Sequence, residues 1–135
     1  MKIHFTRDSV CMGDDCFDNS RDYHFKSNSN IESIIPIIKE NRFLASVSGG
    51  DVVWVLTDFS NKEILSYFTK KDIVIYHVDK NNELSKICSK RRELHFKYYS
   101  SPKRRGEYIN KLYNGDTNHM QKDGFLEEYK MCIYE

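Results

Sequence analysis

The sequence predicts a single α+β domain over residues 1–135, in which an antiparallel sheet of about four strands packs against an N-terminal helix and C-terminal helices. Three observations predict this class. Short segments rich in β-branched and aromatic residues indicate strands. A set of isoleucines at helical spacing indicates a helix with one buried face. A length of 135 residues is typical of one domain with one core.

The first strand is predicted at residues 2–6, where apolar and polar side chains alternate. This alternation places Ile3 and Phe5 on the same face. A shorter strand is predicted at residues 23–26. The polar segment between them is rich in aspartate and cysteine, which makes it the first candidate for a functional loop.

A helix is predicted from Ser29 to about Glu40. Ser29 as N-cap and Glu32 three residues later form a capping-box pattern. Four isoleucines follow at the spacing of one buried helical face: Ile31, Ile34, Ile35 and Ile38. Pro36 lies inside this segment, so the helix either kinks there or begins later than the cap indicates, and the isoleucine pattern favours the kink.

The middle of the chain predicts an antiparallel meander of three strands. Residues 52–56 are apolar on both faces, which is typical of a central strand. A turn at residues 58–61 leads to a returning strand at residues 63–69, and a third strand follows at residues 72–78. The N-terminal strand is expected to add a fourth strand to this meander.

Residues 83–100 carry two patterns at once. Leu84, Ile87 and Cys88 fit a helix, whereas Leu94, Phe96 and Tyr98 alternate as in a strand. Beyond them, Ser101 and Pro102 are typical of a helix start, and this helix is expected to stop at residues 114–115. A last helix is predicted at residues 122–132.

Charge is strongly segregated along the chain although the formal net charge is only +1. Residues 8–22 contain five aspartates and one arginine, a local net charge of −4. Residues 86–111 contain nine lysines or arginines and two glutamates, a local net charge of +7. Five acids and two lysines follow from residue 115 to the end. Either these segments neutralise one another in the fold, or a charged face binds a partner of opposite sign.

No cofactor or metal ion is expected. Cys11 and Cys16 supply half of a zinc site at the loose end of the usual spacing, so small buried cysteines are the simpler interpretation. Asp14, Asp15 and Asp18 lack the alternation and closing glutamate of a calcium loop. No apolar window is long enough to cross a membrane, and the four cysteines are expected to be reduced, so we expect a cytoplasmic protein without a membrane partner.

The sequence favours a binding protein over an enzyme. It contains no glycine-rich phosphate loop, nucleophile elbow or paired-histidine helix. The basic residues 86–111, interleaved with aromatic rings, offer an alternative function as a small regulatory protein that binds nucleic acid. The pI of about 7.7 and the acidic segments make a nucleic-acid partner the weaker hypothesis.

Two stretches carry a resemblance to a known class of protein: KIHFTRDSVCMGDD at residues 2–15 and SGGDVVWVL at residues 48–56. The chain resembles the small bacterial immunity proteins of contact-dependent growth inhibition and related polymorphic toxin systems. The resemblance implies a non-catalytic cytoplasmic protein that binds a cognate toxin domain, frequently a nuclease, and covers its active site. It assigns no binding residues.

An electrostatic argument suggests which residues would meet such a partner. A nuclease exposes a basic cleft for phosphate, so carboxylates on an inhibitor would complement it and speed association. Aromatic residues beside them would anchor the interface. The candidate partner-binding residues are therefore Asp8, Asp14, Asp15, Phe17, Asp18, Asp22, Tyr23, Glu127 and Glu128.

Overall fold

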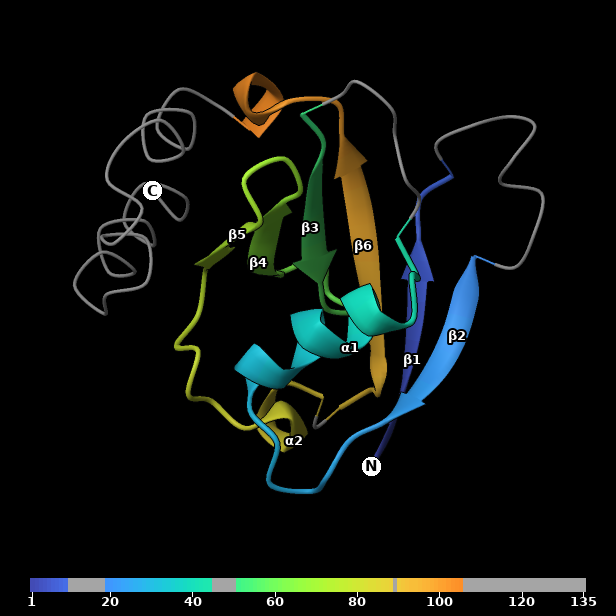
Figure 1. Ribbon diagram of the computed structural model, residues 1–135. Helices are drawn as coiled ribbons and strands as arrows, with labels where there is room; N and C mark the ends of the chain where they lie inside the picture. Colours follow the sequence, from blue (N-terminus) through green and yellow to red (C-terminus); the bar gives the residue numbers. More distant parts are fainter. Residues whose placement is uncertain (10–18, 45–50, 89, 106–135) are drawn as a thin grey trace.

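The computed structural model describes residues 1–9, 19–44, 51–88 and 90–105. They form a mixed α+β fold around one six-stranded sheet with the order β2-β1-β6-β3-β4-β5 (Figure 1). Every neighbouring pair is antiparallel except β1 and β6, which are parallel. The strands are β1 Lys2–Arg7, β2 Ser20–His24, β3 Val53–Thr57, β4 Glu63–Phe68, β5 Ile73–Tyr76 and β6 Glu93–Tyr99.

The N-terminal hairpin confirms the first predicted strand and moves the second. Ile3 and Phe5 of β1 are both fully buried, as their alternation predicts. The second strand begins earlier than expected, at Ser20, because it pairs with β1 in a register that sets Lys2 opposite His24. Phe25, predicted to lie within that strand, follows it and donates its backbone N–H to the Met1 carbonyl.

The predicted meander of three strands is confirmed as β3, β4 and β5. All five residues of β3 are buried, which explains why its sequence is apolar on both faces. The N-terminal strand β1 joins the same sheet, as expected, but through β6, which lies between β1 and β3 and pairs with both. The sheet therefore has six strands instead of about four.

The isoleucine-rich segment begins with a 3-10 turn, η1 (Ile31–Ser33), and continues as helix α1 (Ile34–Glu40). The expectation of a kinked helix is wrong. Helix α1 begins later than the capping pattern indicates, so Pro36 lies in its first turn, where no backbone N–H is needed. Ser29 is not an N-cap either: the N-cap of η1 is Asn30, that of α1 is Ser33, and neither forms a side-chain cap hydrogen bond. The four predicted isoleucines are all buried.

Both patterns in residues 83–100 are present, one after the other. A short helix, α2 (Leu84–Ile87), is followed by β6, whose Leu94 and Phe96 are buried. Pro102 begins a 3-10 turn, η2 (Pro102–Arg105). The rest of the predicted helix after Pro102, and the predicted helix at residues 122–132, lie outside the described residues.

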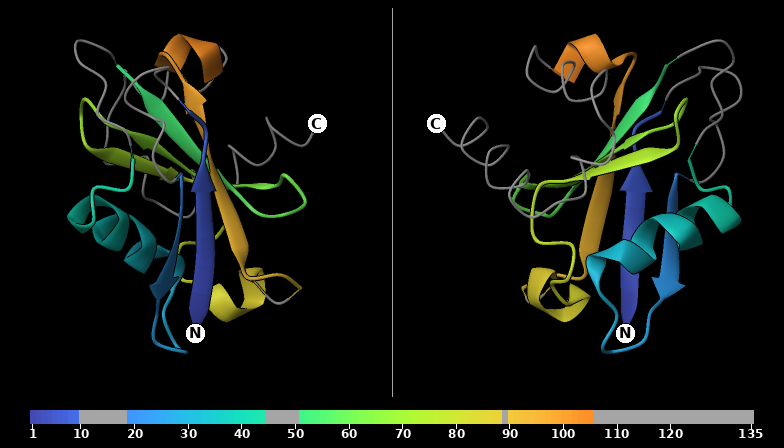
Figure 2. Two further views of the ribbon diagram at one scale, coloured as in Figure 1. Left: turned by 90° about the vertical axis from the view of Figure 1, so that its right-hand side faces the viewer. Right: turned by 60° about the vertical axis from the view of Figure 1, so that its left-hand side comes forward.

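Helix α1 lies across one face of the twisted sheet (Figure 2). The main core lies between them and includes Phe5, Ile34, Ile38, Leu56 and Phe96. The opposite face of the sheet changes character from one side to the other. It is polar and partly exposed over β1 and β6 and buried over β3 and β4. No helix among the described residues is long and apolar enough to span a membrane.

Candidate functional site

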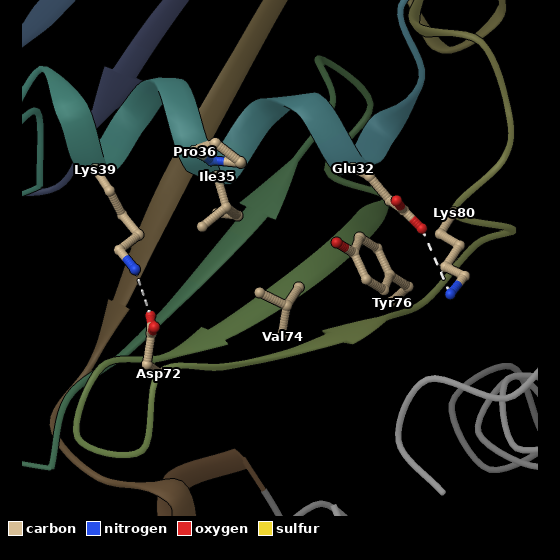
Figure 3. A pocket seen from close by; sticks show the side chains of 8 residues that line it. All are labelled: Glu32, Ile35, Pro36, Lys39, Asp72, Val74, Tyr76 and Lys80. Carbon is tan, nitrogen blue, oxygen red and sulfur yellow. Dashed lines mark hydrogen bonds and ion pairs between the residues drawn. The ribbon is translucent and has the colours of Figure 1, made fainter. Parts of the chain in front are cut away.

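A groove of about 570 Å³ runs between α1 and the edge strand β5 (Figure 3). Ile35 and Pro36 of α1 form one wall, and Val74 and Tyr76 of β5 form the other. Lys39 and Asp72 close one end, and Glu32 and Lys80 close the other. The groove thus has an apolar middle and one cation and one carboxylate at each end.

The ion pairs hold the two ends of the groove in place. Lys39 Nζ lies 2.8 Å from Asp72 Oδ1, and the Tyr67 hydroxyl donates to the same oxygen at 2.6 Å. The hydrogen bond from Lys39, together with the one from Tyr67, lowers the pKa of Asp72. At the other end, Lys80 Nζ lies 3.4 Å from Glu32 Oε1. Asp72 therefore stays ionised across the neutral pH range. One pair joins α1 to the residue before β5, and the other joins η1 to the loop after β5.

Strand β5 is the last strand in the order of the sheet, so one of its edges has no neighbouring strand among the described residues. The His77 N–H donates to the Ile64 carbonyl at 2.8 Å. Antiparallel ladders alternate, so Ile73 and Ile75 also direct their backbone groups toward β4, whereas Val74 and Tyr76 direct theirs away from it. The same two residues whose side chains line the groove thus present backbone donors and acceptors at its open side.

Two of the predicted carboxylates lie on the polar face of the sheet, and each already has intramolecular partners. Asp8 accepts hydrogen bonds from His95 Nε2 at 2.8 Å and from the Tyr98 N–H at 2.9 Å. Asp22 lies 2.6 Å from His4 Nδ1, and Lys2 Nζ is 3.9 Å away. Asp8 and Asp22 are still 43% and 45% exposed, so both can accept further hydrogen bonds from a partner.

Tyr23, the predicted aromatic anchor, is half-buried. Its ring packs against Phe5 and Phe43, with centroids 5.8 and 6.0 Å apart. Burial raises the pKa of its phenol, and the positive charge of Arg21 partly offsets that effect. Tyr23 therefore belongs largely to the core. The other predicted contacts lie outside the described residues: Asp14, Asp15, Phe17, Asp18, Glu127 and Glu128.

A hydrogen-bonded row of Thr6, His95 and Asp8 crosses the polar face. Thr6 Oγ1 lies 2.6 Å from His95 Nδ1, and the parallel register sets these two residues side by side. They border a hollow of about 250 Å³. Sequence reasoning missed this row because its members are 87–89 residues apart and meet only through the β1–β6 pairing. Both ring nitrogens of His95 form hydrogen bonds, so this row holds the side chains of Thr6, His95 and Asp8 in place.

A second polar network lies on the buried part of the same face. Arg105 forms a bidentate ion pair with Glu63, at 2.7 and 2.9 Å, and donates to Ser66 Oγ at 3.2 Å. Ser66 Oγ in turn lies 2.7 Å from His77 Nε2. The Arg105 guanidinium also stacks on the Tyr99 ring, 4.9 Å from its centroid. The side chains of Arg105, Glu63, Ser66 and His77 thus form one connected polar network.

The predicted basic segment is divided in space. Lys90, Arg91 and Arg92 precede β6, whereas Arg104 and Arg105 follow it, and a seven-residue strand separates them by about 20 Å. Its aromatic rings are also engaged: Phe96 is buried, Tyr98 packs on Trp54, and Tyr99 lies under Arg105. Within the part of the segment that the structure describes, the arrangement offers no continuous strip of cations and free rings for a nucleic-acid strand.

The cysteines and aspartates of the first candidate functional loop, at residues 11–18, lie outside the described residues. Within the part of the chain that the structure describes, no group of three or more histidine, cysteine, aspartate or glutamate side chains is placed to hold a metal ion. Cys88 is buried and free, and burial raises the pKa of its thiol to about 11. Such a thiol packs as a small apolar side chain and is a poor nucleophile at neutral pH.

Comparisons with protein-family models, with curated proteins and with solved structures found no match.

Proposed function

We propose that this protein is a non-catalytic immunity protein that binds a toxin domain and covers its active site. The observation that carries the protein-binding part of this proposal is the outer edge of β5, which no other strand of the described residues pairs with, beside the apolar groove. An extended segment of a partner can add to such an edge through main-chain hydrogen bonds, while its alternate side chains enter the groove. The resemblance in the sequence supplies the class of partner.

The acidic face gives the proposal an electrostatic part. Asp8 and Asp22 lie on the other side of the sheet from the groove wall formed by α1. Their charges therefore act at a distance, by steering a basic partner toward the protein before contact. Under this proposal the β5 edge sets the lifetime of the complex, and the acidic face sets the rate at which it forms.

The first experiment asks whether a complex forms. The product of the neighbouring gene is co-expressed with this protein, and co-purification and protection of growth are measured. Formation of a stoichiometric complex together with protection supports the immunity function. Purification of the two proteins apart, with no protection, excludes it.

A second experiment locates the interface. Val74→Pro removes an outward-facing N–H of β5 and keeps the bonds to β4, a position where an edge strand tolerates proline. Val74→Ala is the matched control, because it shortens the same side chain and keeps the N–H. We expect Val74→Pro to shorten the lifetime of the complex more than Val74→Ala does. Equal lifetimes for the two variants would place the interface away from this edge.

A third variant tests the steering. Asp22→Asn removes one carboxylate of the exposed face, where its partners His4 and Lys2 are also exposed. We expect a slower association rate, a weaker dependence of that rate on salt, and an unchanged dissociation rate. An association rate that does not change would remove the acidic face from the proposal and leave the β5 edge in place.

A further inference from the structure

The turn between β3 and β4 presents an exposed aromatic ring on a rigid support. Asp58 holds the turn, because its Oδ1 accepts the N–H groups of Ser60 and Lys62 at 2.8 and 3.0 Å. The Asp58 carbonyl accepts the Asn61 N–H at 3.0 Å, and Asn61 has a positive φ of 70°, a conformation that asparagine tolerates well. Phe59 lies at the tip of the turn and is 46% exposed. Among the described residues it is the one large apolar residue that is exposed.

Phe59 lies at the rim of a hollow of about 330 Å³ that is distinct from the groove beside β5. Apolar side chains from three elements line it: Ile64 of β4, Val78 after β5, and Ile87 of α2. An exposed ring next to an apolar lining is the arrangement found at the centres of protein interfaces, where aromatic residues contribute disproportionately to affinity. The turn is already ordered, so binding would cost little conformational entropy there.

Three lysines surround this hollow: Lys62, Lys86 and Lys90. All three are exposed, and none forms an ion pair within the described part of the chain. The one carboxylate in the lining, Asp58, accepts the hydrogen bonds that hold the turn. The rim therefore carries three cations against one carboxylate, and a partner that brings further carboxylates would complement this excess of positive charge.

We propose that this hollow binds an acidic peptide segment of a partner protein. Carboxylates of the segment pair with Lys62, Lys86 and Lys90, and an apolar side chain enters between Phe59 and the lining. A peptide fits better than a nucleic acid, because the lining is apolar and Phe59 is a single ring, whereas single-stranded nucleic acid needs a series of stacking platforms. This site does not depend on the proposed toxin partner or on the β5 edge.

The test uses a fluorescein-labelled synthetic peptide of glutamates around one central leucine. Two control peptides carry serine in place of the leucine or lysine in place of the glutamates. We expect saturable binding of the first peptide, measured by fluorescence anisotropy, with an affinity that falls as salt rises. In nuclear magnetic resonance spectra, the amides of Phe59, Lys62 and Lys86 should shift on binding. Equal binding of the serine control, or no saturable binding, overturns the proposal.

Matched variants separate the site from general charge. The double variant Lys86→Glu/Lys90→Glu is compared with Lys26→Glu/Lys70→Glu, which changes the net charge equally at exposed lysines elsewhere. The first should weaken binding about tenfold or more, and the second should change it little. Equal weakening by both double variants overturns the proposal.

Phe59→Ser tests the apolar contact without a change in charge, and its fold is expected to persist because the ring is exposed. We expect it to weaken peptide binding about tenfold. Unchanged affinity in this variant overturns the proposed role of the ring. A labelled oligothymidylate is titrated in parallel. If it binds through the same lysines while the acidic peptide does not, the site is one for nucleic acid and the proposal is wrong.

Discussion

His77 is a histidine in the interior of the fold. It is fully buried, it shares a hydrogen bond with Ser66, and the bidentate pair of Glu63 and Arg105 lies beside it. Burial lowers the pKa of its imidazole well below the usual value, and the positive charge of Arg105 lowers it further. The folded protein therefore holds His77 neutral, although histidine in water titrates near neutral pH.

This environment predicts a loss of stability in mild acid. Below about pH 6.5 the imidazole binds a proton in the unfolded chain but stays neutral in the folded chain. The free energy of unfolding therefore falls as pH falls. The full contribution of neutral His77 to the free energy of unfolding is present above pH 6.5. It decreases progressively as the pH falls toward the lower pKa of His77 in the folded state. Urea unfolding between pH 5 and pH 8 measures this slope. We expect His77→Gln to reduce the slope; an unchanged slope in His77→Gln contradicts the assignment.

The ion pairs of this protein should differ sharply in their effect on stability. The Arg105 side chain is only 7% exposed, so Glu63→Gln removes a carboxylate that forms a bidentate pair with a buried guanidinium. We expect that substitution to lower the free energy of unfolding by about 2–4 kcal/mol. Lys39→Ala breaks the exposed pair with Asp72 and should cost about 1 kcal/mol or less. Chemical denaturation of both variants gives the comparison, and similar losses would show that the Glu63 pair is not effectively buried.

At the scale of the element, local patterns predicted most of the secondary structure. Alternation located β1, and the apolar run with its turn located β3, β4 and β5. These patterns are local because side chains on a strand or helix face the core at fixed intervals. The position of β6 could not be predicted in the same way. Its parallel pairing with β1 joins residues that are about 90 positions apart in the sequence. A local pattern of apolar residues does not indicate which strands become neighbours.

Pro36 shows how two local rules can conflict. The capping pattern at Ser29 placed the proline inside a helix, whereas the Ser29 carbonyl in fact accepts the Leu84 N–H. This contact belongs to the bridge between Asn30 and Glu83, so a tertiary pairing uses the residues that would have capped the helix. The α-helix starts at Ile34 instead, and the proline lies where its missing N–H costs nothing.

This position predicts a small effect for Pro36→Ala. The substitution should change the free energy of unfolding by less than about 1 kcal/mol, because no hydrogen bond is regained in the first turn. Lys39→Pro, near the end of the same helix, should lower the free energy of unfolding by about 3 kcal/mol more than Lys39→Ala does. Lys39→Ala is the control for the ion pair that both variants lose. Thermal or urea unfolding of the three variants provides the measurement. A stabilisation or loss of several kcal/mol in Pro36→Ala would mean that α1 begins elsewhere.

At the scale of the molecule, charge segregation along the chain did not predict charge segregation in space. The strand β6 divides the basic segment, and Arg105 turns inward to Glu63. Two of the predicted acidic contacts, Asp8 and Asp22, do lie on one exposed face, because β1 and β2 are neighbours. The groove and the Phe59 hollow were not predicted, since each combines residues from elements that only the topology brings together.

The topology also predicts an order of hydrogen exchange. β3 is hydrogen-bonded to β4 and β6, and all of its residues are buried, so its amides open only when most of the sheet unfolds. β2 pairs with β1 alone and is exposed at three of its five positions, so it can separate without disturbing the core. Amide exchange followed by mass spectrometry should therefore show the slowest exchange in β3 and β6 and the fastest strand exchange in β2. Because the outer edge of β5 is the proposed docking edge, a bound partner strand should slow exchange at Val74 and Tyr76 and leave β2 unchanged. Protection that appeared in β2 instead would place the partner on the opposite edge of the sheet.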